Sequence, residues 1–422
     1  MTKAEQLNEI LKRDAPAAAA SLSRFGRALA FPQGIPSQTA EAAGCELKAT
    51  IGQLTDGKGH AMAVDALASH LVGIEPEQAL LYGNAAGLKP LRELWRDRQA
   101  REGHGTPTSL PAVVCGLTHG LAVTADLFLE PGVEVLVPTP YWGNSRLLFE
   151  ARHGARIVGY PFFDAALRFN TAGLAQALAG VQGRAVVLLN FPSNPQGFSP
   201  RLEDIEPLVA LLVNHPGPLV VVLDDAYHGI VFEDGALRES LFWALSRRAD
   251  PARLLVVKVD GCTKELLFFG GRVGFLTFST AGEAGEALVD KVMASTRSTV
   301  SIPPGPSQAL ALAALRHPDI DAQIQERLVM LRGRWEAMQA ALATLPEGGR
   351  LKPLPNNAGF FGLVAVDPDI DVQELRLSLI RDHSVGVISI PEINALRLAF
   401  CSTRAEDMPE LIRRIQLAVS AH

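Results

Sequence analysis

Two basic side chains, Lys264 and Arg272, follow a strongly apolar run at residues 254–259 and lie eight positions apart. A lysine amine that has lost its proton, through burial or a neighbouring cation, can form a Schiff base with an aldehyde. An arginine can hold a phosphate through its planar guanidinium. The pair therefore suits a ligand that carries both groups, such as pyridoxal 5'-phosphate. The competing interpretation is a pair of solvated surface charges.

Other motifs also follow apolar runs. A glycine-rich turn at residues 116–120 opens a helical pattern, and backbone N–H groups there, with the hydroxyl of Thr118, make a phosphate site. The alternative is that Thr118 only caps the helix. A loop at residues 191–197 contains Asn194, whose amide can meet a ligand oxygen or belong to a plain turn.

Two acidic residues, Asp224 and Asp225, stand with Tyr227 at the end of the apolar run at residues 218–223. A carboxylate at the end of a buried strand needs a partner, because an isolated buried charge is costly. A protonated pyridine nitrogen is a suitable partner, since the pair keeps the ring cationic. The alternative is that either aspartate caps a helix.

An aromatic pair and an arginine complete the set of candidates. Trp142 or Tyr141 follows a strand and can stack on a flat ligand, or can pack in the core. Arg397 alternates with Leu396 and Leu398 on a predicted strand, so its side chain points to the other face. If that face borders a cleft, Arg397 can bind a carboxylate with two hydrogen bonds, and otherwise it is a surface charge.

The elements that position these residues read as alternating strands and helices between residues 111 and 278. Continuous apolar runs are typical of strands buried on both faces, and strand–helix alternation indicates a parallel sheet. The seven predicted strands are residues 112–115, 133–137, 156–159, 185–190, 219–223, 254–259 and 273–278. We therefore expect an α/β fold, with a mostly parallel seven-stranded sheet sandwiched by helices. The last two runs are too close for a crossover helix and are expected to be antiparallel.

A change of pattern after residues 303–306 (Pro-Pro-Gly-Pro) predicts a smaller α+β domain. It comprises a helical region at residues 307–343, interrupted at His317-Pro318, then strands at 360–366, 385–390 and 396–400 and a helix at 406–419. The expected division is an N-terminal segment (1–55) that has no sheet signal and packs on the small domain, a large domain (56–305) and a small domain (306–422).

Composition excludes several classes of protein. The 422 residues are 48% hydrophobic and 20% charged, which is typical of a folded globular protein. The net charge of −6, without a basic run, argues against nucleic-acid binding. The four cysteines are scattered singly, which fits the cytoplasm. We expect no membrane partner, because the longest apolar stretches are interrupted before they could span a bilayer. We expect no metal site, because the histidines lack the spacing of metal-binding motifs.

The order of motifs resembles that of the class I/II aminotransferases, which are pyridoxal-phosphate enzymes of fold type I. The resemblance covers residues 50 to the C-terminus. The motifs that carry it are Tyr82 with Gly87 and Leu91-Arg92, GLTHGL (116–121), PYW (140–142), NFPSNPQG (190–197), DDAY (224–227), TKE (263–265), GGRVGF (270–275) and LRLAF (396–400).

The resemblance implies a role for each candidate. Lys264 is the Schiff-base lysine and proton shuttle, and Asp224 binds the pyridine nitrogen. Tyr227 and Asn194 bond the phenolic oxygen, and Trp142 stacks on the ring. The phosphate contacts are the backbone of Leu117, Thr118, Arg272 and Tyr82 of a partner subunit, which implies a homodimer. Arg397 and Asn194 bind the substrate carboxylate, and Gly34, Ile35, Phe360 and Phe361 are candidates for the side-chain pocket.

Two departures from the family pattern stand out. Many relatives have a serine three residues before the lysine, where this chain has Gly261, so Thr263 or water is expected to substitute. Aspartate-specific relatives carry an arginine shortly after the Pro-Pro turn, and none follows Pro303-Pro304 here. The absence of this arginine argues that the protein does not use it to prefer substrates with an acidic side chain.

The expected reaction is ping-pong transfer of an amino group between an L-amino acid and a 2-oxo acid. Alternatives on the same site are a β-lyase, a racemase, a decarboxylase or an oxidase that uses the same cofactor. A non-catalytic pyridoxal-phosphate sensor is disfavoured, because the chain shows no helix-turn-helix pattern.

Overall fold

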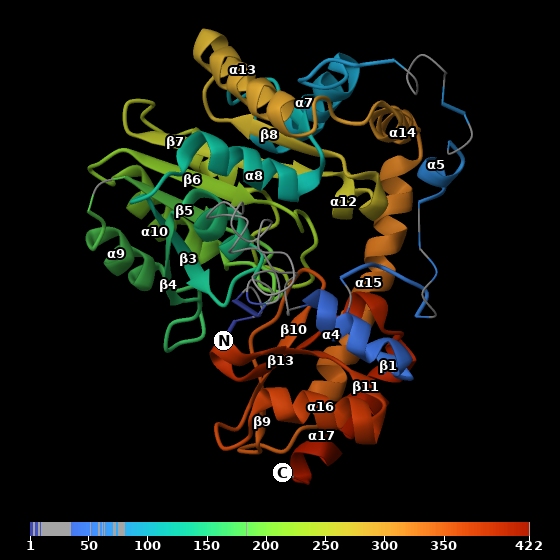
Figure 1. The fold of residues 1–422 in the computed structure, drawn as a ribbon. Helices are drawn as coiled ribbons and strands as arrows, with labels where there is room; N and C mark the ends of the chain where they lie inside the picture. The colour runs from blue at the N-terminus through green and yellow to red at the C-terminus, as the bar shows by residue number, and fades with distance from the viewer. Residues whose placement is uncertain are drawn as a thin grey trace.

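The computed structural model describes residues 1–2, 5–6, 9, 35–50, 52–57, 60, 62, 64–70, 73–74, 81–182 and 184–421. Its largest element is a seven-stranded sheet with the order β2-β8-β7-β6-β5-β3-β4 (Figure 1). The strands are β2 (Ala112–Val114), β3 (Glu134–Thr139), β4 (Arg156–Pro161), β5 (Ala185–Leu189), β6 (Leu219–Asp224), β7 (Leu254–Gly261) and β8 (Gly274–Phe278).

Pairing in this sheet is mostly parallel, as the continuous apolar runs predict. Strands β4, β3, β5, β6 and β7 pair in parallel, whereas β8 is antiparallel to both β7 and β2. The prediction of an antiparallel pair around Lys264 is therefore confirmed. Parallel strands bring their carboxyl ends to one edge, so the loops after β5, β6 and β7 meet there.

Helices cover both faces of the sheet, so the predicted α/β class is confirmed. Val259 faces α8, where Gly120 allows close packing, since a Cβ at Gly120 would lie 2.7 Å from Val259. Phe275 faces α7, where Trp95 stacks on it with ring centroids 4.3 Å apart. The flanking helices are α7 (Lys89–Gly103), α8 (Gly116–Phe128), α9 (Thr171–Ala179), α10 (Leu202–Val213), α11 (Leu241–Ser246), α12 (Cys262–Glu265) and α13 (Gly282–Thr299).

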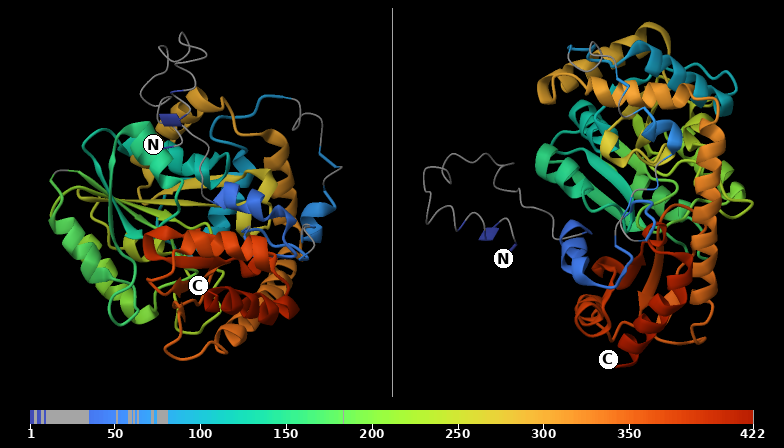
Figure 2. Two further views of the ribbon diagram at one scale, coloured as in Figure 1. Left: turned by 60° about the horizontal axis from the view of Figure 1, so that its bottom comes forward. Right: turned by 90° about the vertical axis from the view of Figure 1, so that its right-hand side faces the viewer.

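Two helices lead from this sheet to a second one. Helix α14 (Gly305–Arg316) and the long α15 (Ile320–Leu342) are separated at His317-Pro318, as predicted. Figure 2 shows α15 running beside both parts of the molecule. The second sheet is antiparallel, with the order β12-β13-β10-β9. It contains β9 (Leu351–Pro353), β10 (Gly362–Val366), β12 (Ile388–Ile390) and β13 (Ala395–Leu398), with α16 (Val372–His383) and α17 (Met408–Ser420) packed together beside it.

Two sequence-based expectations were wrong in detail. The first fifty residues do contain a strand, β1 (Leu47–Lys48), which pairs in parallel with β11 (Val385–Gly386). The single strand expected at residues 385–390 is divided, because β11 pairs with β1 while β12 pairs with β13. The remaining elements are α4 (Ile35–Glu41), η1 (Ala42–Gly44), α5 (Asp65–Ala68), η2 (Arg146–Ala151), η3 (Phe269–Gly271), η4 (Pro391–Ile393), η5 (Phe400–Ser402) and η6 (Ala405–Asp407). No helix within the described residues has the length and apolar character needed to cross a bilayer.

Candidate functional site

Lys264 lies on the short helix α12, immediately after β7, and faces a cleft of about 250 Å³. Burial lowers the pKa of its amine to about 8, and Arg272 acts in the same direction, while Asp224 opposes them. At pH 7 about a tenth of this amine is therefore neutral, far more than for an ordinary lysine, and the neutral form is what nucleophilic attack on an aldehyde requires. The cleft is lined by Gly52, Gln53, Trp142, Asn194, Tyr227, Thr263, Lys264, Phe269, Arg272, Phe361 and Arg397.

Gly261, the last residue of β7, explains one departure from the family pattern. Its φ is +154°, and a Cβ there would lie 2.6 Å from both the Val273 oxygen and the Gly274 Cα. Side chains rarely adopt that conformation, and the close contacts are with backbone that cannot easily yield. A serine therefore does not fit where many relatives have one. The nearby Thr263 has a buried hydroxyl that lines the cleft and bonds no described residue.

Asp224 is the last residue of β6 and is buried, with one carboxylate oxygen that bonds no described residue. Burial raises its pKa to about 6, Asp225 adds to the rise, and Lys264 opposes it. At pH 7 Asp224 is thus mostly ionised and attracts a cation. Neither aspartate caps a helix, because Asp225 instead accepts a hydrogen bond from Ser240 and pairs with Lys258.

Asn194 connects the two sheets through its side chain. Its amide nitrogen lies 3.5 Å from the Tyr227 hydroxyl, and its amide oxygen accepts a hydrogen bond of 3.1 Å from Arg397. The Lys264 amine lies 5.0 Å from the centre of the Tyr227 ring. Burial raises the pKa of Tyr227, so its hydroxyl remains protonated and available as a donor. The motifs expected at three different strand ends therefore meet in one cleft.

Arg397 is almost fully buried, so the alternative of a surface charge is wrong. Its guanidinium lies 4.0 Å from the Phe361 ring centre and donates to the Thr50 carbonyl at 2.7 Å. Burial lowers its pKa to about 10. Its Nε bonds no described residue, and no carboxylate pairs with it among the residues that the structure describes. A buried cation with spare donors at a cleft is suited to binding a carboxylate.

The N-terminus of α8 lies close to the guanidinium of Arg272. Gly116 permits this approach, because a Cβ at that position would lie 2.3 Å from the guanidinium of Arg272. Leu117 and Thr118 follow in the first turn, where backbone N–H groups have no partner within the helix. Since the helix begins before Thr118, that residue does not cap it. The arrangement combines free donors with a cation, as an anion site requires.

The remaining candidates fall in three places. Trp142 lines the cleft, whereas Tyr141 bonds Arg146 and faces elsewhere, in agreement with the preference for Trp142. Tyr82 is highly exposed and does not line the cleft of its own chain. Gly34 lies outside the described residues. Of the side-chain pocket candidates, Phe361 lines the cleft.

A second cavity, of about 280 Å³, lies behind Lys264 and is lined by Glu102, His228, Lys258, Asp260 and Glu265 among others. We place the site in the first cleft, because the chemistry-bearing strand-end residues converge there.

The first cleft fits pyridoxal 5'-phosphate. It offers a lysine with a lowered pKa for the aldehyde and an arginine beside a helix start for the phosphate. The unpartnered oxygen of Asp224 suits the protonated ring nitrogen, and Trp142 offers an aromatic face. Each requirement of the cofactor is met by a different element of the sheet edge.

Comparison with known proteins agrees with this assignment. The model of the family "Aminotransferase class I and II" matches residues 47–415. An aspartate aminotransferase from Rhizobium meliloti strain 1021 is 31% identical over 311 residues, 69% of each chain, and the aminotransferase tdiD of Emericella nidulans is 28% identical over 364 residues, 81% of this chain and 80% of tdiD. A further Rhizobium meliloti aspartate aminotransferase is 30% identical over 232 residues, so the matched part spans about half of its length (52%).

Solved structures share the fold at low identity. The kynurenine aminotransferase of Pyrococcus horikoshii, solved with PMP, has a TM-score of 0.80 at 18% identity, with 96% of this chain and 98% of that one covered. An aminotransferase of Anaerococcus prevotii has a TM-score of 0.79 at 19% identity, with 93% and 97% covered. The chain therefore belongs to the class I and II aminotransferase family, whose members are enzymes that depend on pyridoxal 5'-phosphate.

Proposed function

We propose that this transaminase moves an amino group between an L-amino acid and a 2-oxo acid by a ping-pong mechanism. One observation carries the proposal: Lys264 and Arg397 line the same small cleft, the first as a partly neutral amine and the second as a buried cation with spare donors. An α-amino acid presents an amine and a carboxylate on one carbon. The two side chains suit those two groups.

Arg397 and Asn194 would orient the substrate. The Arg397 guanidinium is already fixed by Thr50 and by stacking on Phe361, so binding a carboxylate orders little further. With the carboxylate held there, the α-proton would lie within reach of the Lys264 amine. Lys264 then acts as Schiff-base lysine and as the base and acid that moves this proton.

Pyridoxal phosphate, when bound, supplies an electron sink for the charge released at the α-carbon. Asp224 would hold its ring nitrogen protonated, and Tyr227 with Asn194 would bond its phenolic oxygen. Trp142 would stack on the ring. Its phosphate would be held by the Leu117 backbone, Thr118 and Arg272, with the free hydroxyl of Thr263 replacing the serine that Gly261 excludes.

We further propose a cytoplasmic homodimer in which Tyr82 contributes to the phosphate site of the other subunit. The high exposure of Tyr82 in the single chain is compatible with burial between subunits. We also propose that the chain divides into an N-terminal segment (1–55), a large domain (56–305) and a small domain (306–422). Gly34 is proposed to contact the substrate.

Lys264→Ala tests the proposal. Turnover should fall by roughly 10³-fold or more, because both the Schiff base and the proton carrier are lost. Borohydride reduction of the wild-type holoenzyme, followed by peptide mapping, should place the trapped cofactor on Lys264. Trapping on Lys258, or normal turnover by the variant, would refute the assignment.

A substrate screen separates transamination from other reactions of this cofactor. The purified holoenzyme is incubated with each common L-amino acid and several 2-oxo acids. We expect a new amino acid and a new 2-oxo acid in equal amounts. Release of ammonia, carbon dioxide or peroxide, or inversion at the α-carbon without transfer, would contradict the proposal.

A further inference from the structure

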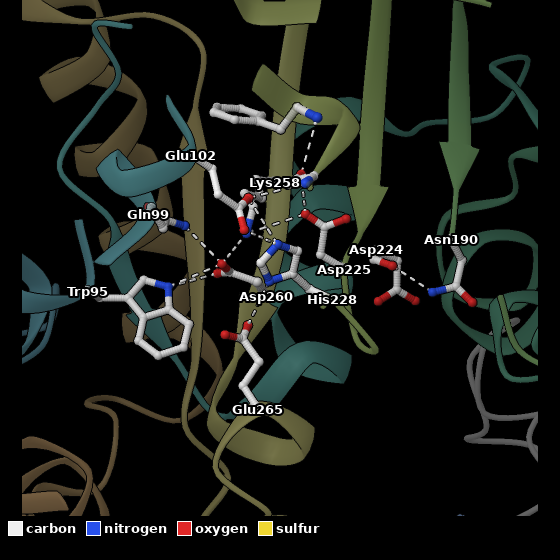
Figure 3. A network of polar contacts seen from close by, with 12 residues as sticks. Trp95, Gln99, Glu102, Asn190, Asp224, Asp225, His228, Lys258, Asp260 and Glu265 are labelled. Carbon is white, nitrogen blue, oxygen red and sulfur yellow. Dashed lines mark hydrogen bonds and ion pairs between the residues drawn. The ribbon is translucent and has the colours of Figure 1, made fainter. Parts of the chain in front are cut away.

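Three of the proposed cofactor-binding residues are each followed in the sequence by a charged residue that does not line the first cleft. Asp224 is followed by Asp225, Tyr227 by His228, and Lys264 by Glu265. The three following residues belong to one buried polar network, which Figure 3 shows. The backbone therefore links each proposed cofactor-binding residue directly to a member of this network.

Lys258 lies near the centre of the network. Its amine pairs with Asp225 at 3.3 Å and bonds the carboxylate of Asp260. Trp95 and Gln99 of α7 donate to the same Asp260 at 3.1 Å and 2.9 Å, so the network joins α7 to the sheet. Burial alone would lower the pKa of Lys258, but the two aspartates outweigh it and raise that pKa, so Lys258 is a cation.

His228 forms the second centre. Its Nε2 lies 2.9 Å from Glu102 of α7, and its Nδ1 lies 3.8 Å from Glu265. Burial would lower its pKa, but the hydrogen bond with Glu102 and the nearby carboxylate of Glu265 raise it to about 10. His228 is therefore positively charged at neutral pH. Within the described residues, no grouping of three His, Cys, Asp or Glu side chains can hold a metal ion.

We propose that Asp225, His228 and Lys258 are positioning residues: they fix Asp224 and Lys264 from behind and set the charge that both experience. The proposal rests on the roles given above to Asp224 and Lys264 as cofactor-binding residues. Lys258 and His228 offset Asp225, which stands next to Asp224 and would otherwise hinder its ionisation. Asp224 in turn acts directly on Lys264.

The sign of each effect follows from Coulomb's law. Near pH 8, where Lys264 titrates, Asp224 with its pKa of about 6 is already ionised, so the network acts on Lys264 directly through space. Removing a negative charge from the network then makes the protonated amine of Lys264 less favourable and lowers its pKa. Removing a positive charge raises it. On the side of the cleft, the charged and titratable groups around Lys264 are Asp224, Tyr227, Arg272, Arg397 and Cys401. On the side of the second cavity they come from α7 (Arg98, Arg101, Glu102), the turn after β6 (His228), β7 (Lys258, Asp260), α12 (Glu265) and α15 (Arg327), with Asp225 behind them against Lys258.

The test compares Asp225→Asn with His228→Gln in the cofactor-free protein. Cyanate reacts with neutral amines, so the pH dependence of carbamylation at Lys264, measured by mass spectrometry, reports the pKa of Lys264. We expect Asp225→Asn to lower that pKa and His228→Gln to raise it, each by about half a pH unit or more. The double variant should lie between them. In the holoenzyme, the pH midpoint of the cofactor absorbance change should move in the same two directions.

Controls separate this role from a purely structural one. His153→Gln removes a similar contact, 3.2 Å from Asp126, outside the network and the cleft, and should lower the melting temperature without moving the Lys264 midpoint. If Asp225→Asn does not fold, Glu265→Gln removes another negative charge and should also lower the midpoint. Shifts of opposite sign support the proposal. Unchanged midpoints, or shifts in one direction for both variants, overturn it.

The labelling measures neither cofactor binding nor turnover. If the Lys264 pKa does not shift in opposite directions in the two variants while transamination is normal, only the positioning role is refuted. Opposite shifts in a protein that transfers no amino group would refute the proposed function and leave the electrostatic coupling standing.

Discussion

The cleft and the buried network behind it are built from neighbouring residues but differ in how their charges are satisfied. In the network, each cation has a carboxylate partner: Lys258 pairs with Asp225 and Asp260, and His228 pairs with Glu102. Only Gln99 and Glu265, among the network residues named above, keep a buried oxygen that bonds no described residue. In the cleft, the hydroxyl of Thr263 and the Nε of Arg397 bond no described residue, and neither does one carboxylate oxygen of Asp224, which lies beside the cleft near Lys264.

This difference distinguishes buried charges that stabilise the fold from buried charges that are available to bind a ligand. Compensated buried charges fix the backbone, and removing one partner leaves the other uncompensated. Uncompensated groups raise the free energy of the empty site and are stabilised when a complementary ligand arrives. Burial of a charged residue alone therefore does not indicate a binding role. A binding role is indicated when the buried group also lacks a partner within the protein.

Asp224→Asn should have the largest effect among the variants that keep Lys264. The ring nitrogen would lose its anionic partner, so turnover and α-proton exchange should both fall by on the order of 10²-fold. Asp225→Asn, measured in parallel for α-proton exchange, should lose much less. If α-proton exchange falls equally in the two variants, the cleft and the network do not differ in their roles.

Arg397→Ala should weaken substrate binding while cofactor occupancy is retained. Removing one partner of a desolvated charge pair costs roughly 2–5 kcal/mol, so apparent substrate affinity should fall by at least about tenfold. A matched amine without the carboxylate should react equally well with the variant and with wild type. If the variant loses its cofactor instead, Arg397 is a structural residue and the carboxylate site lies elsewhere.

Gly261→Ser sharpens the comparison at the backbone that joins the two regions. The new Cβ would meet backbone atoms at 2.6 Å, so the free energy of unfolding should decrease by about 1–3 kcal/mol. Chemical denaturation measures this, with Gly270→Ser as a control, because a Cβ at Gly270 has no atom within 4 Å. Equal stability of both variants would show that a serine fits at position 261 after all.

The pH dependence of Lys264 gives the smallest predicted effect. Its folded-state pKa of about 8 lies below the ordinary 10.5, so the folded state releases this proton at lower pH than the unfolded state does. Stability of the cofactor-free protein should therefore gain from this group as pH rises from 8 to 10.5. Carbamylation of Lys264 should rise with pH and level off above 8. A plateau only above pH 10 would mean that the amine is not desolvated.

Much of the cleft is predictable from the sequence, because the candidates follow apolar runs and parallel strands end at one edge. Lys264, Asp224 and Asn194 meet for that reason, and strand alternation places Arg397 toward them. The network was missed, although Lys258 and Asp260 gave a signal: opposite charges two positions apart on one face of a buried strand. The role of Gly261 depends on contacts with a neighbouring strand, which residue spacing does not reveal.

Arg397 touches parts of the chain that are hundreds of residues apart: the Thr50 carbonyl, the Asn194 side chain and the Phe361 ring. These contacts form only when the N-terminal stretch, the central sheet and the C-terminal sheet are all in place. A chain that had folded only its central part could present Lys264 to the cofactor and still leave the amino acid without an anchor. If Arg397 holds the substrate carboxylate as proposed, recognition of the substrate requires all three parts of the chain to be folded.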